Sequence, residues 1–134
     1  MKKPGSKNPA RGRLKPMRVS EGFSDFVLDQ LAGLADLEAK PMFGGIGLYA
    51  GDVFFGIVAA DVLYLKVGDA NRADYERAGA EPFAPYPTGK MSTSYYSVPA
   101  GVLEDSRTLV RWVTRSIDAA RRARRITGKR RRGA

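Results

Sequence analysis

The fold is decided between Phe43 and Val67, where the chain reads FGGIGLYAGDVFFGIVAADVLYLKV. Three runs in this stretch are rich in β-branched and aromatic residues, as β-strands are, and they span residues 43–49, 53–59 and 62–67. Their spacers are only two or three residues long, and spacers this short connect neighbouring strands as antiparallel hairpins. The stretch therefore predicts a three-stranded meander.

A helix is predicted on the N-terminal side of the meander. Apolar residues recur there at three- and four-residue steps, which places them on one helical face: Phe23, Phe26, Val27, Leu31 and Leu34. Ser20 is placed to cap this helix. The pattern breaks between Asp36 and Pro41, because proline disfavours a helical conformation in the residue before it.

On the C-terminal side, Gly68 and Asp69 end the third strand, and Asp69 is expected to cap a short helix that stops at Gly79. Residues 81–90 contain three prolines, which predicts a loop or an irregular edge strand. Residues 91–98 form a strand-like run of serine, threonine and tyrosine that Pro99 closes.

The last predicted element is a long helix capped by Asp105. Its inner face collects Leu109, Trp112, Val113, Ile117 and Ala120. The apolar spacing stops near Arg121, so we expect fraying beyond it. The full order, α-β-β-β-α-β(-β)-α, predicts a two-layer α+β domain with an antiparallel sheet and its helices on one face.

Charge divides the chain into three parts. The net charge is +9, yet residues 1–18 and 121–134 contain cations and no acid, so all 14 acidic residues lie between them. A proline-containing basic segment buries too little apolar surface to offset its ordering entropy. We therefore expect a disordered basic arm over 1–19, a folded domain over 20–120 and a basic tail over 121–134.

The cations of both ends are candidate contacts to nucleic-acid phosphates. Such contacts bind the backbone without reading sequence and depend steeply on salt. The candidates are Lys2, Lys3, Lys7, Arg11, Arg13, Arg121, Arg122, Arg124, Arg125, Lys129, Arg130, Arg131 and Arg132. The alternative is that the basic ends are incidental and only aid solubility.

The sequence offers little for catalysis. It has no cysteine and no histidine, so the commonest thiolate and imidazole chemistry is excluded, and no carboxylate spacing predicts a metal site. The letters from Gly45 to Ala50 match a dinucleotide fingerprint, but a strand follows where that fingerprint needs a helix. Ser92 to Tyr96 could supply a serine nucleophile with a tyrosine or Lys90 as base, although alternating hydroxyl and aromatic residues are typical of a half-exposed strand.

Four blocks of this sequence, in order, resemble the TfoX (Sxy) N-terminal domain family: residues 42–49, 63–66, 79–83 and 91–99. The family motif residues, which we interpret as mainly structural, are Met42, Phe43, Gly44, Gly45, Gly47, Tyr49, Ser92, Ser94, Tyr95 and Tyr96. The resemblance implies a two-layer domain without established catalytic residues. It also implies a link to bacterial competence and transcription regulation.

We therefore expect a non-catalytic, cytoplasmic, regulatory interaction module without a cofactor. Its expected partners are nucleic acid and a protein, the latter from transcription, and not a membrane, since no apolar run approaches the roughly 18 residues of a span. The alternatives are a protein-binding adaptor, or a small-ligand binder or enzyme that uses the strand from Ser92 to Tyr96 near Lys66 or Lys90. The oligomeric state stays open.

Overall fold

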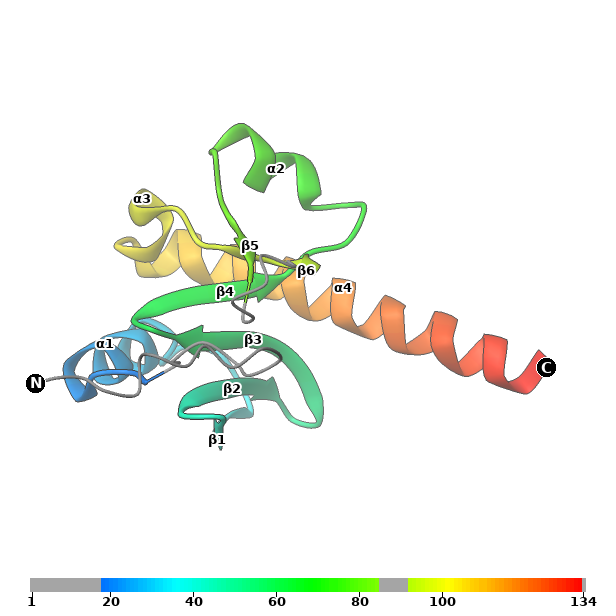
Figure 1. Cartoon of the computed structure of the whole chain (residues 1–134), viewed down its shortest axis with the longest axis horizontal. Coiled ribbons are helices and arrows are strands. Elements are labelled where there is room, and N and C mark those ends of the chain that lie inside the picture. Colours follow the sequence, from blue (N-terminus) through cyan, green and yellow to red (C-terminus); the bar gives the residue numbers. More distant parts are fainter. Residues whose placement is uncertain (1–17, 85–91, 134) are drawn as a thin grey trace, which may run out of the picture.

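A computed structural model describes residues 18–84 and 92–133, and it contains an antiparallel sheet with the strand order β1-β2-β3-β4-β6-β5 (Figure 1). The strands are β1 (Leu37–Met42), β2 (Gly45–Ala50), β3 (Val53–Ala59), β4 (Val62–Lys66), β5 (Pro82–Phe83) and β6 (Ser92–Ser97). The helices are α1 (Glu21–Gln30), α2 (Arg72–Arg77), α3 (Ala100–Leu103) and α4 (Ser106–Gly133). The predicted α+β class is confirmed.

The predicted meander corresponds to β2, β3 and β4, which pair in sequence as antiparallel neighbours. Strand β1 was not predicted, because the region before Pro41 was interpreted as a break. Pro41 pairs with Ile46 at the outer edge of the sheet, where a residue without an N–H is tolerated. The middle of β1 is exposed on both faces, so it lacks the apolar alternation that would have indicated a strand.

Strand β3 contains a bulge that changes which side chains face the helices. Leu48 of β2 pairs with Gly56, whereas the next residue, Tyr49, pairs with Phe54, so Phe55 has no partner on β2. Phe55 is fully buried in the main core. Because of the extra residue, Phe54 and Tyr49 meet on the opposite face of the sheet, with ring centroids 5.1 Å apart.

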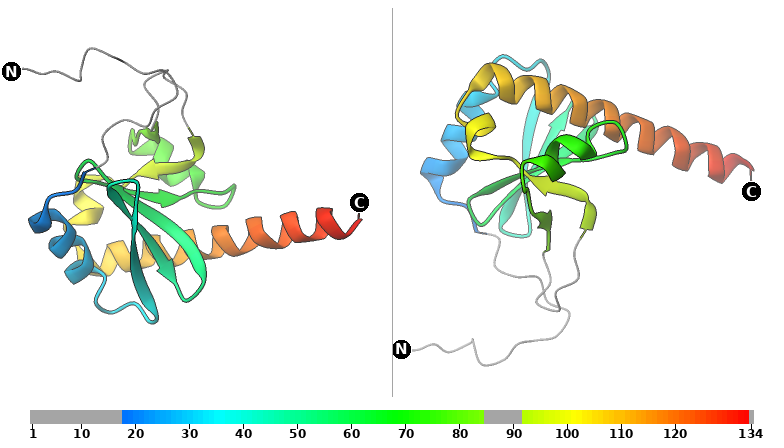
Figure 2. Two further views of the ribbon diagram at one scale, coloured as in Figure 1. Left: turned by 60° about the horizontal axis from the view of Figure 1, so that its bottom comes forward. Right: turned by 90° about the horizontal axis from the view of Figure 1, so that it is seen from above.

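The main core lies between one face of the sheet and the helices. Val27 and Leu31 at the α1 end, Tyr75 of α2 and Leu109 of α4 are all buried in one apolar cluster with the strands. Figure 2 shows α4 crossing this face and continuing past the sheet. The helices therefore gather on one face, as predicted.

Three helix ends test the predicted caps. Ser20 caps α1, since its Oγ accepts a hydrogen bond from the Phe23 N–H (3.3 Å), and Asp105 accepts from the N–H groups of Arg107 and Thr108 at the start of α4. The prediction for α2 was wrong: the cap position is Asn71, not Asp69. Asn71 instead holds the preceding loop, because its amide oxygen accepts from the Gly68 N–H at 2.7 Å.

Helix α4 does not fray after Arg121 but extends to Gly133. Arginine and alanine are both strong helix formers, so this part of the helix does not depend on an apolar face. The short helix α3 was also not predicted. The C-terminal basic run is thus presented on a helix that projects beyond the sheet (Figure 2).

Candidate nucleic-acid interface

The outward face of α4 carries a row of exposed arginines. Arg107, Arg111, Arg115, Arg122 and Arg125 follow three-, four- and seven-residue spacings, which place them on one side of the helix. With a rise of about 1.5 Å per residue, the row from the first to the last spans about 27 Å. Asp118 interrupts the row, so positive charge is concentrated towards each end.

The arginines near the C-terminal end of the row differ in their partners. Arg124 contacts the hairpin turn between β2 and β3, with its Nη1 3.5 Å from the Asp52 carboxylate. A hydrogen bond from Arg124 is the main cause that lowers the pKa of Asp52, and Arg121 adds a smaller electrostatic effect. Arg121, Arg122 and Arg125 are exposed and form no ion pair with any residue in the described part of the chain.

Arg115 is held by an acid of α2. Its Nη1 lies 2.7 Å from Asp74, and Arg77 approaches the same carboxylate at 2.6 Å. Asp74 is only 25% exposed, so it is the more buried member of both pairs. Asp74 and Asp52 therefore neutralise Arg115 and Arg124. Arg121, Arg122 and Arg125 remain exposed to solvent.

A groove lies between α4 and the loop that leads from β4 to α2. Its volume is about 540 Å³, and its lining includes Lys66, Asp69, Ser94, Asp118 and Arg122. Arg115 lines it as well. The groove mixes cations and acids, and this composition suits a ligand with both charged and polar groups.

A second groove of about 380 Å³ lies beside the first, and the two share Lys66 and Ala123. Its walls include the rings of Phe54 and Tyr95 together with Asp52 and Arg124. Lys66 Nζ lies 5.2 Å from the centre of the Tyr95 ring. Partial burial lowers the pKa of Lys66, and no carboxylate of a described residue lies within ion-pair distance of it.

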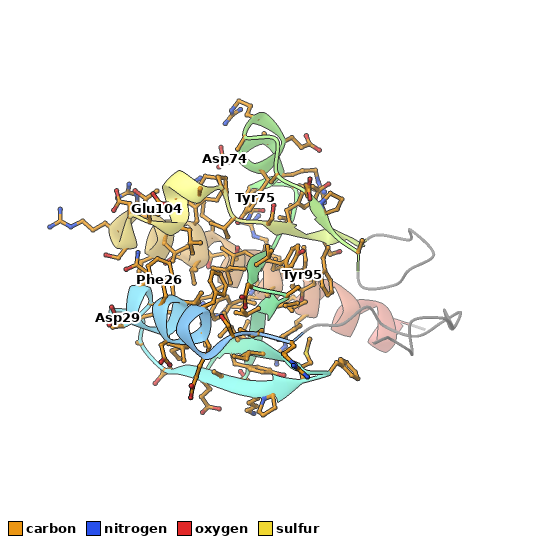
Figure 3. The ribbon with its side chains drawn as sticks, turned by 60° about the vertical axis from the view of Figure 1, so that its left-hand side comes forward. Phe26, Asp29, Asp74, Tyr75, Tyr95 and Glu104 are labelled. Atoms are coloured by element: carbon orange, nitrogen blue, oxygen red, sulfur yellow. The ribbon has the colours of Figure 1, made fainter. Side chains whose placement is uncertain are left out.

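The tyrosines of β6 point to opposite sides of the sheet. Tyr96 belongs to the helix side, where its hydroxyl accepts a hydrogen bond from Arg72 (3.5 Å) and its ring lies 6.1 Å from that of Tyr75. Tyr95, labelled in Figure 3, lies on the other side, where its ring centroid is 5.8 Å from that of Phe54. Burial raises the pKa of Tyr95 to about 12, which opposes its use as a general base near neutral pH.

The glycine motif has a structural explanation. Phe43 and Gly44 have φ angles of 50° and 88° in the turn between β1 and β2, and Gly45 pairs with Met42 directly after it. A Cβ at Gly47 would lie 3.1 Å from the Phe54 ring and 3.4 Å from that of Tyr49. A strand follows these glycines, as the sequence indicated, so the helix of a dinucleotide site does not begin there.

Several predicted site residues lie outside the described part. Lys2, Lys3, Lys7, Arg11 and Arg13 fall before residue 18, and Lys90 falls in the second undescribed segment. The structure also gives no side-chain description for Ser92 or for Lys129, Arg130, Arg131 and Arg132. Of the predicted nucleic-acid contacts, four are therefore placed by the structure: Arg121, Arg122, Arg124 and Arg125.

Sequence reasoning expected Lys66 near the strand from Ser92 to Tyr96, but it missed Phe54 and Asp52 as parts of the same groove. Asp52 and Arg124 are 72 residues apart, and nothing local to either residue indicates the contact. The only available signal was the placement of Lys66 and Tyr95 near strand ends, and these residues pair across β4 and β6.

The architecture and the grooves define a two-layer α+β domain with a projecting basic helix. The family model described as TfoX N-terminal domain matches residues 29–120, which is more than half of the chain. This protein belongs to the TfoX N-terminal domain family, as the sequence blocks suggested. A comparison with curated proteins found no match. None of the described helices is long and apolar enough to cross a membrane.

Proposed function

We propose that this domain is a non-catalytic regulatory module that binds nucleic-acid phosphates through α4. The observation that supports it is the exposure of Arg121, Arg122 and Arg125 without ion pairs to any described residue. A helix holds their side chains at fixed spacing, so less ordering entropy is lost on binding than for a flexible tail. The contacts are to the backbone and carry no sequence information.

The salt dependence of binding tests this proposal. We would measure the affinity for a labelled duplex by fluorescence anisotropy at several salt concentrations, with the double variant Arg121→Gln/Arg125→Gln. Each lost phosphate contact lowers the slope of log affinity against log salt by about 0.9, so the double variant should lose about 2. Glutamine preserves helix propensity, so α4 should remain folded.

A matched control removes the same charge elsewhere. Arg77→Gln/Arg107→Gln changes two exposed arginines, one on α2 and one at the far end of α4. Its slope should change by less than half as much as that of the test variant. Equal changes for both variants would indicate a net-charge effect and reject a specific role for the C-terminal half of α4.

A second candidate is binding of a small anionic ligand in the 540 Å³ groove. The half-buried Lys66 favours it, because a cation without a carboxylate partner is available to an anion. Phosphate-containing small molecules should then raise the Tm of the wild-type protein but not that of Lys66→Met. An equal rise in both proteins would reject this candidate.

A further inference from the structure

Three aromatic rings form a continuous row on the sheet face opposite the main core. Tyr49, Phe54 and Tyr95 come from β2, β3 and β6, and successive ring centroids are 5.1 and 5.8 Å apart. This row contacts a small apolar cluster around Ile57 and Ala59, whose members all come from strands. All three rings are only partly buried, and those of Phe54 and Tyr95 line the smaller groove.

Cations accompany the rings along the row. Lys40 Nζ lies 4.8 Å from the centre of the Tyr49 ring, and Lys66 lies over Tyr95 as described above. Arg124 also lines the smaller groove; it is 57% exposed, and Asp52 is its ion-pair partner among the described residues. A lysine therefore lies beside each end of the aromatic row; Lys40 pairs with Glu38 at 3.8 Å, whereas Lys66 has no carboxylate of a described residue within ion-pair distance.

The two grooves join this row to the basic helix. Arg122 lines the larger groove, and Phe54, Tyr95 and Arg124 line the smaller one, while Lys66 belongs to both. A ligand that follows the grooves would pass from the arginines of α4 around the end of the sheet to the aromatic rings. The larger groove contributes charged and polar groups, and the smaller groove contributes the two rings together with Lys66 and Arg124.

Single-stranded nucleic acid has the matching chemistry. Its bases expose their ring faces, which stack on aromatic side chains without regard to sequence, while its phosphates follow a basic groove. In a duplex, the bases stack on one another, so their faces cannot reach Phe54 or Tyr95. Asp69 and Asp118 line the larger groove beside its cations. Asp52 is the acid of the smaller groove, and a phosphate would compete with it for Arg124.

We propose that a single strand lies in the two grooves, with bases stacked on Phe54 and Tyr95 and phosphates held by Lys66, Arg122 and Arg124. This inference rests on the proposed function, since the arginines of α4 supply part of the affinity. It adds that the preferred form of nucleic acid is the single strand.

The test compares two probes that carry the same label. One is an oligothymidylate of about 12 nucleotides, within the site size of small single-strand binders, and the other is a blunt duplex with an equal number of phosphates. The wild-type protein should bind the single strand at least about tenfold more tightly. Tyr95→Leu should lose about tenfold on the single strand and leave the duplex affinity unchanged.

Tyr64→Leu is the matched control, because Tyr64 lies on the same sheet face beside Phe83 but does not line the grooves. Should Tyr95→Leu fail to fold, Lys66→Gln alters the same groove and should lower single-strand affinity several-fold. Equal effects of the Tyr95 and Tyr64 variants would overturn the inference.

The possible outcomes distinguish failure of the single-strand site from failure of the proposed phosphate binding by α4. Equal wild-type affinity for both probes, with a loss on both in Arg121→Gln/Arg125→Gln, rejects the single-strand site and keeps phosphate binding by α4. No binding to either probe at low salt rejects both proposals.

Discussion

Gly56 should not tolerate even a methyl group. It follows the bulge at Phe55 in β3, pairs with Leu48 and Leu65 on the two neighbouring strands, and is buried in the sheet. A Cβ built there would lie 3.1 Å from the Leu65 side chain and 3.1 Å from the Tyr64 backbone oxygen. The backbone oxygen cannot move without disturbing the β3–β4 pairing, so the strain cannot be relieved by a rotamer change alone.

Overpacking of this kind destabilises a protein by about 1–3 kcal/mol. For a folded body of roughly 100 residues, each kcal/mol lowers Tm by about 4–8 °C. Gly56→Ala should therefore lower the Tm, measured by circular dichroism, by at least about 4 °C. The midpoint of urea unfolding should fall with it, without a large change in slope.

The same chemical change at Gly22 provides the control. Gly22 lies in α1, and nothing stands within 4 Å of a Cβ built there. Gly22→Ala should raise the free energy of unfolding by about 0.5–1 kcal/mol, because alanine favours a helix. If the Tm of Gly56→Ala equalled or exceeded that of the wild type, the sheet would have room for a methyl group at position 56. The predicted overpacking would then be refuted.

Three further predictions concern polar groups. Asp105→Ala should lower the free energy of unfolding at pH 7. Hydrogen bonds from Thr108 lower the pKa of Asp105, so the difference in this free energy between wild type and variant should shrink as the pH falls below the ordinary pKa of 3.8. Urea unfolding at several pH values measures it. The double variant Tyr75→Phe/Ser116→Ala should melt at or above the wild-type temperature, because the two buried hydroxyls interact at most with each other and neither has another hydrogen-bond partner among described residues. Asp52→Asn should tighten nucleic-acid binding at low salt in an anisotropy titration, because it releases Arg124.

The sequence predicted the elements whose signals are local. The meander between Phe43 and Val67, the Ser20 and Asp105 caps and the apolar face of α4 each depend on neighbouring residues, and the structure contains them. Strand β1 was missed because an exposed edge strand has no apolar alternation. The bulge in β3 was missed because it makes consecutive residues buried, which removes the two-residue period.

The candidate site was less predictable, for a different reason. The sequence identified the C-terminal arginines as a group but not which of them the folded body neutralises. That distinction depends on Asp52, which lies in a hairpin turn far away in sequence, and on Asp74 of α2. Local patterns carry no information about such contacts.

The position of the grooves follows from where the apolar face of α4 ends. Among the described side chains, Ala120 is the last one of α4 in the main core, and Arg124, one turn later, contacts Asp52 at the end of the sheet. Beyond Ala120 the helix leaves the sheet, so Arg121, Arg122 and Arg125 face solvent while Lys66 and Tyr95 line the open end of the strands. Because the bulge at Phe55 turns Phe54 to the same end of the opposite face, charge and aromatic surface meet there. The proposed binding path is thus a consequence of two local features, the length of the apolar stripe on α4 and one extra residue in β3.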